Sequence, residues 1–202
     1  MKRVLLVLAA IAVVAAIVVA MAVLPMMSSG LSTHEEPTRM EATVARMVRH
    51  WAVPSDLRDA KNPMPLTPAA LADGRAHFAD HCAGCHGNDG KGGGLGGQMY
   101  PRAPDMTLER TQSLSDGELF AIIENGVRLT GMPGFGTGTA ESAHGTWALV
   151  HFIRHLPELT VAEIAEMETL NPKSPAEWQQ MQEERAFLAG EGEEPEAAPH
   201  QH

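Results

Sequence analysis

Two cysteines and a histidine stand together in the run Cys82-Ala83-Gly84-Cys85-His86. This C-x-x-C-H pattern is the attachment signature of c-type haem. Two thiols three residues apart on a helical turn can each form a thioether to one edge of a porphyrin, and the neighbouring imidazole then lies under the iron. The sequence predicts one covalently bound haem c per chain, held by Cys82 and Cys85, with His86 as an axial ligand of the iron.

Two other uses of paired cysteines compete with haem attachment. A thioredoxin-like redox pair predicts a neighbouring βαβ pattern, which this sequence lacks. A structural zinc site needs a second pair of ligands at a suitable distance, and the chain has no further cysteine. Haem attachment is therefore the favoured interpretation.

An electron-carrying haem needs a ligand on the other face of the iron, and a methionine thioether raises the reduction potential. Of the 12 methionines, Met132 is the strongest candidate, since it stands in a Gly-Met-Pro-Gly loop far beyond His86. Pro133 stiffens that loop, and its glycines allow close approach to a ring. Met99 and Met106 are the rivals, because they follow His86 more closely.

The N-terminus carries an apolar run from Val4 to Met27, preceded by Lys2 and Arg3. At ~1.5 Å per residue the run is long enough to cross a hydrocarbon core of ~30 Å. We expect an uncleaved single-pass anchor in the bacterial inner membrane, with a cytoplasmic N-terminus and a periplasmic haem domain. A cleaved signal peptide is the alternative, because residues 20–22 form a small-x-small triplet.

The exported part is acidic. It holds 25 acidic residues and 13 of the 15 basic ones, a formal charge of −12. Without a basic patch, nucleic acid is excluded as a partner. An acidic surface steers toward a positively charged protein partner, although plain solubility explains it equally well.

Helix signals without any alternating strand pattern predict an all-α fold. We expect helices over residues 40–51, from Thr67-Pro68 into the haem motif, from the Ser115–Glu118 capping box through Ile123, over about 143–156, and from Thr160 and Ser174. The glycine-rich residues 87–97 read as a flexible loop. The expected division is an anchor (1–30), a spacer with a short helix (31–65), the haem domain (66–158), a helical extension (159–189) and a disordered tail (190–202).

Residues 66–158 resemble class I c-type cytochromes. The match consists of Gly74-x-x-x-Phe78-x-x-x-Cys82-x-x-Cys85-His86-Gly87, Pro104-Asp105-Met106, Gly131-Met132-Pro133 and the terminal helix Trp147–Leu156. The stretch from Val44 through Lys173 is similar to membrane-anchored bacterial monohaem cytochromes.

The resemblance implies roles for two residues outside the C-x-x-C-H run. Gly74 would let the first helix of the domain cross the last one closely, at Phe152. The Pro104 carbonyl would accept a hydrogen bond from the outer N–H of His86, with Pro101 as a rival. The chain departs from the family at Met106, where leucine is usual.

The expected function is one-electron transfer by a non-enzymatic carrier between a redox protein donor and an acceptor, with a membrane respiratory complex as one candidate partner. A haem subunit of a redox enzyme and a haem-based gas sensor are the alternatives. Both need an iron position that a substrate or gas can enter, and Met132 would close it. Tyr100 and Arg102 are candidate contacts for the haem carboxylates.

Overall fold

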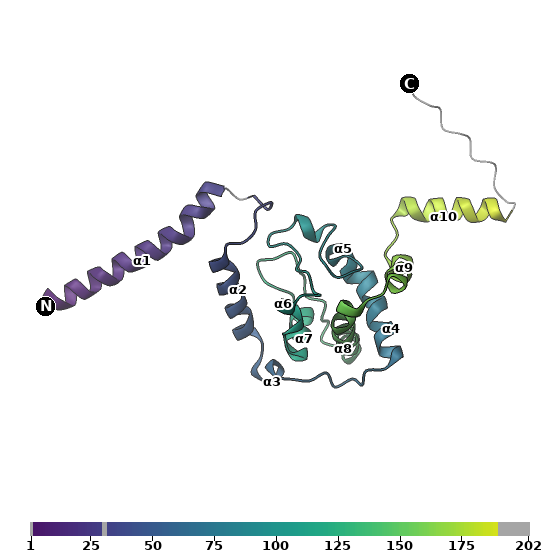
Figure 1. Cartoon of the computed structure of the whole chain (residues 1–202), viewed down its shortest axis with the longest axis horizontal. Coiled ribbons are helices and arrows are strands. Elements are labelled where there is room, and N and C mark those ends of the chain that lie inside the picture. The colour runs from purple at the N-terminus through teal and green to yellow at the C-terminus, as the bar shows by residue number, and fades with distance from the viewer. Residues whose placement is uncertain (1, 30–31, 190–202) are drawn as a thin grey trace, which may run out of the picture.

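The computed structural model describes residues 2–29 and 32–189. Within these residues the chain forms helices and loops and no strand, so the all-α prediction is confirmed (Figure 1). The tail predicted to be disordered, residues 190–202, lies outside the described residues.

The elements fall into three groups along the chain. The N-terminal group is α1 (Lys2–Ser29), α2 (Arg39–Ala52) and α3 (Ser55–Arg58). The central group is α4 (Pro68–His77), the π-helical turn η1 (Phe78–Cys82), α5 (Ala83–His86), the 3-10 turn η2 (Gly96–Gln98), α6 (Glu109–Gln112), α7 (Asp116–Asn125) and α8 (Ala140–His155). The C-terminal group is the 3-10 turn η3 (Leu156–Glu158), α9 (Val161–Leu170) and α10 (Pro175–Leu188).

The first helix is apolar from Val4 to Met27 and has the length of a membrane span. Its residues Lys2–Met21 have a mean hydropathy of 3.2, and none of that stretch is buried against the rest of the protein. The helix therefore fits a single-pass membrane anchor.

Helix starts lie where the capping residues predict them. Thr67 caps α4 by accepting a hydrogen bond of 3.1 Å from the Ala70 N–H. Capping boxes open α7 at Ser115, α9 at Thr160 and α10 at Ser174. The expected start of α8 is three residues late, because Thr139 caps the helix from Ala140. The short helix α3 was not expected, since the prolines around it read as a linker.

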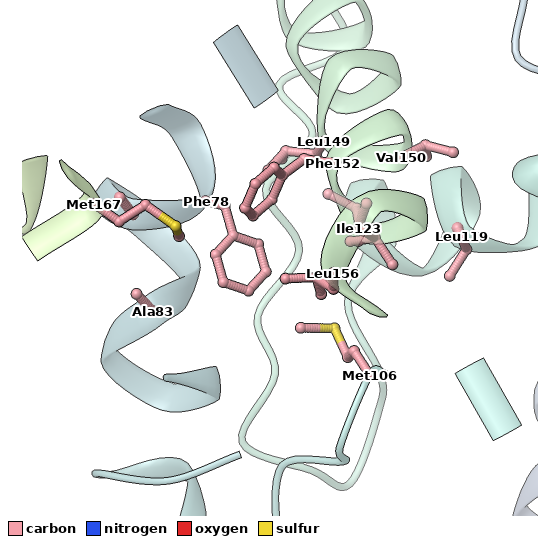
Figure 2. Packing of buried hydrophobic residues seen from close by; sticks show 12 residues of the cluster. Phe78, Ala83, Met106, Leu119, Ile123, Leu149, Val150, Phe152, Leu156 and Met167 are labelled. Atoms are coloured by element: carbon pink, nitrogen blue, oxygen red, sulfur yellow. The ribbon is translucent and has the colours of Figure 1, made fainter. Parts of the chain in front are cut away.

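The core lies where α4 crosses α8. A Cβ on Gly74 would overlap the Ala148 carbonyl oxygen and lie 3.0 Å from the Phe152 Cβ, so the close crossing expected at Gly74 is confirmed. Directly beyond it, the rings of Phe78 and Phe152 pack with their centroids 5.2 Å apart. Figure 2 shows these rings at the centre of the buried cluster, with Met167 of α9 pointing toward Phe78.

Gly74→Ala is expected to destabilise the protein by about 1–3 kcal/mol, because an extra methyl group forces two packed backbones apart. Gly145→Ala is the matched control in α8, since its Cβ would meet only the His77 ring at 3.4 Å. Urea unfolding followed by circular dichroism measures both. Equal stability of the two variants would contradict the close packing of α4 against α8 at Gly74.

Arg154 connects α8 by hydrogen bonds to the segment from the end of α6 to the start of α7. Its guanidinium donates to the Asp116 carboxylate at 2.8 Å and to the carbonyl oxygens of Gln112 and Leu114 at 2.6 and 2.5 Å. Burial alone would raise the pKa of Asp116, but the hydrogen bonds from Arg154 and the Asn62 backbone outweigh it and lower the pKa. The negative charge of Asp116, at the start of α7, is thus compensated by Arg154.

The helix α9 packs into the core, because Met167 is fully buried. Glu163 stabilises this packing through ion pairs with Arg75 at 3.5 Å and with His155 at 2.9 Å. Burial would raise the pKa of Glu163, yet hydrogen bonds from Thr160 and His155 lower it to about 2. The packed unit therefore extends through α9, past the expected boundary at residue 158.

Glu163→Gln is expected to cost about 1 kcal/mol at neutral pH, because it removes the charge while a glutamine can still serve the capping box. A lowered folded-state pKa gives stability that is complete above the ordinary value and is lost as the pH falls toward 2. Urea unfolding between pH 2 and 7 should show this loss in the native protein and a flatter profile in the variant. If stability falls equally with pH in the native protein and in the variant, Glu163 is not the group responsible for the loss.

Candidate haem-binding site

The C-x-x-C-H run lies where one continuous helical segment changes its winding. The π-helical turn Phe78–Cys82 joins α4 to α5, and Cys82 is its last residue. A π-turn widens the helix and is frequent at functional sites. Here it directs Phe78 and Ala79 into the core and leaves Cys82 half-buried at the end of the turn. No feature of the sequence predicted this turn.

The Cys82 thiol does not have the property expected of a redox-active pair. Burial, followed by the nearby Cys85, raises the pKa of Cys82 to about 12. Reactive C-x-x-C pairs depend on a lowered thiol pKa. The raised pKa of the Cys82 thiol therefore disfavours the thioredoxin-like alternative. Within the described residues no group of three or more histidine, cysteine or acidic side chains could hold a metal ion.

The surroundings of the His86 imidazole favour its neutral form. Burial lowers the pKa of His86 below its usual value, and the backbone carbonyl of Pro104 acts in the opposite direction. That carbonyl therefore lies beside the ring, where the resemblance places it, although Nδ1 makes no hydrogen bond of normal geometry and stays buried. A neutral, buried imidazole is the form that binds iron. The donor set of Cys82, Cys85 and His86 fits haem c.

The glycine-rich loop lies directly on the C-x-x-C-H turn. Gly92 donates to the His86 carbonyl at 2.8 Å, and Leu95 donates to the Gly84 carbonyl at 3.3 Å. A Cβ on Gly96 would overlap the Cys85 carbonyl oxygen. The loop expected to be flexible is thus held by hydrogen bonds, and its glycines permit contact with the turn. The density of glycine could have indicated this close approach.

Met132 lies in a loop closed by its own backbone. Its carbonyl accepts from Val127 at 3.1 Å, and its N–H donates to the Thr130 hydroxyl at 3.1 Å. A Cβ on the adjacent Gly131 would meet the Met99 side chain, including its Cε at 3.2 Å. The loop that carries Met132 is therefore beside the loop that follows the C-x-x-C-H turn. Met132 itself is half-buried.

The two rival methionines differ in their surroundings. Met106 is 7% exposed and belongs to the core cluster, where Figure 2 shows it beside Leu156. Packing accounts for its position, as it would for the leucine usual there. Met99 is half-buried against Gly131 and stays a rival to Met132 as the second iron ligand.

Tyr100 and Arg102 contact the N-terminal segment. The Tyr100 hydroxyl donates to the Glu41 carboxylate at 3.2 Å, and Arg102 donates to the His34 carbonyl at 2.9 Å. In this structure the two side chains considered for the haem carboxylates connect the haem domain to the segment around α2.

Comparison with known families agrees with the geometry. Residues 69–153 match the family described as cytochrome C oxidase, cbb3-type, subunit III. The matched segment runs from α4 to α8 and includes the C-x-x-C-H run, the glycine-rich loop and the Met132 loop. No curated protein matches the chain. The combination of this match, the all-α fold and the attachment motif identifies residues 69–153 as a c-type cytochrome domain.

Proposed function

We propose that the protein is a one-electron carrier with a single haem c. Cys82 and Cys85 would attach the haem, and His86 and Met132 would be its axial ligands. The observation that carries the proposal is the helical turn that brings together Cys82, Cys85 and the half-buried His86 imidazole, with the Pro104 carbonyl beside that imidazole. The family match supports haem-based electron transfer in general.

The haem would supply the one-electron redox chemistry. The residues of the chain would hold it and exclude competing reactions. Two thioethers would fix one edge of the ring to the π-turn and α5. The Pro104 carbonyl would orient His86 through its outer ring nitrogen. Met132 would occupy the remaining position, so that electrons pass without a substrate at the iron, which argues against the enzyme and gas-sensor alternatives.

We place the haem domain on the periplasmic side of the inner membrane, anchored by α1. Lys2 and Arg3 precede the span, which favours a cytoplasmic N-terminus. Sodium carbonate should leave the protein in the membrane, and N-terminal analysis of the mature protein should find residues of α1. A carbonate-soluble product starting near Ser28 would show that the segment is a cleaved signal peptide.

The partners would be a redox protein donor and an acceptor. The matched family is described as an oxidase subunit, and a membrane respiratory complex is therefore a candidate partner. A formal charge of −12 beyond the anchor favours a partner with a basic surface.

Stopped-flow mixing of the purified full chain with candidate redox proteins tests the carrier function. We expect rapid reduction and reoxidation, with second-order rates that fall as salt rises, because the Debye length is only ~10 Å at 0.1 M. An uncharged chemical reductant is the control, since its rate should not depend on salt. Slow exchange with every redox protein would contradict the carrier function.

A further inference from the structure

The helix α2 has an apolar face that nothing in the described structure covers. Val44 and Val48 are 53% and 55% exposed, close to the 58% of Val18 in the unburied helix α1. Trp51 is 67% exposed. The face is formed by residues at helical spacing, namely Met40, Val44, Met47, Val48 and Trp51.

The opposite side of α2 is the one that contacts the haem domain. Val53, directly after the helix, is buried, and Arg49 is half-buried near the Glu118 carboxylate. His50 Nδ1 lies 2.8 Å from the same carboxylate, and Glu41 accepts from Tyr100. Figure 1 shows α2 lying along one side of the domain. These contacts turn the apolar face away from the domain and toward the surroundings.

We propose that the apolar face of α2 lies on the membrane surface and orients the haem domain there. The proposal rests on the membrane anchorage proposed above. An amphipathic helix with a strong apolar face and basic residues on its polar side is suited to the interface of an anionic bilayer. The occupant is therefore the lipid surface, on the side of the membrane where α1 ends.

Two further observations favour a lipid surface over a protein partner. The first is distance: α2 begins ten residues after Ser29, so the connecting chain spans at most ~35 Å, and the helix cannot move far from the membrane. The second is charge: α2 carries three arginines, of which Arg39 and Arg46 are exposed, and one glutamate, whereas the whole chain has a net charge of −10. A basic helix in an acidic protein complements anionic lipid headgroups.

The orientation of the haem domain follows from the contacts of α2. One end of the helix is joined to the loop after the C-x-x-C-H turn through Glu41 and Tyr100. The other end is joined to the start of α7 through His50 and Glu118. Because α2 contacts two separate parts of the domain, binding of α2 to the membrane surface would fix the distance of the haem site from the bilayer. It would also fix the angle of the domain to the bilayer surface.

Spin labels on the full-length, haem-loaded protein in liposomes test the proposal. The labelled variants are Val48→Cys on the apolar face and Arg46→Cys, the matched control on the polar side. In vesicles containing phosphatidylglycerol, we expect the label at position 48 to be several-fold more accessible to oxygen than to a soluble nickel chelate. The label at position 46 should show the reverse preference. Val44→Cys replaces Val48→Cys if that variant does not fold.

Equal nickel accessibility at positions 48 and 46 would overturn the proposal. So would protection of position 48 from both reagents in detergent solution, because this would indicate a second copy or a protein partner on the face. Unsubstituted protein is labelled in parallel, and label on it would mean that the native thiols are free. Vesicle flotation reports the anchorage by α1 independently, so failure of the proposed function is distinguishable from failure of this inference.

Discussion

Replacing both Cys82 and Cys85 with serine is expected to abolish covalent haem attachment. Each thiol would form one thioether, so a single Cys→Ser variant should retain one bond and the double variant none. Haem staining of a denaturing gel measures the loss directly, because only covalently attached haem stays with the chain. Acidified organic solvent should release haem from the double variant and none from the native protein.

Gly84→Ser is the matched control for the double variant. It introduces the same side chain into the same turn, at a position where a Cβ would meet nothing within 4 Å. This variant should keep its haem through denaturation. Haem released by solvent from the native protein, or a stained band in the double variant, would contradict c-type attachment.

Met132→Ala is expected to lower the reduction potential by at least about 0.1 V, within the roughly 0.8 V over which axial ligands set haem potentials. Loss of the thioether removes the ligand that favours the reduced metal. The weak near-infrared band of a sulfur-ligated ferric haem should disappear with it. A redox titration and a near-infrared spectrum of the purified variant measure the two effects.

Met99→Ala and Met106→Ala are the controls, because both residues compete for the same role. Met106→Ala should reduce stability through its cavity in the core and leave the near-infrared band in place. If Met99→Ala removes the band while Met132→Ala retains it, the ligand is Met99. A band that survives all three substitutions would point to a histidine on the second face.

The sequence predicted those parts of the fold that depend on local chemistry. Serine and threonine followed three residues later by glutamate located the starts of α7, α9 and α10. The spacing of Cys82, Cys85 and His86 specified the family, since few other chemistries need that pattern. Gly74 was predicted only through the family resemblance, and the structure supplies its reason in the backbone of Ala148.

The parts that escaped prediction depend on tertiary contacts. The π-turn Phe78–Cys82 has no composition of its own, and it forms where Phe78 packs against Phe152. From the sequence, α9 was assigned to a helical extension. In the structure it packs against the haem domain, because Met167 is buried in the core. For α2, the apolar spacing predicted the helix, but the direction of its apolar face depends on tertiary contacts such as the pair between His50 and Glu118.

Carbon monoxide binding to the reduced, purified full chain tests most directly whether this protein is a closed electron carrier. If His86 and Met132 both hold the iron, binding should be slow and independent of carbon monoxide concentration at high gas pressure, because Met132 must leave first. The same preparation should show negligible turnover of peroxide. Rapid binding that rises linearly with concentration, together with substantial peroxide turnover, would contradict the account and favour a haem enzyme or a gas sensor.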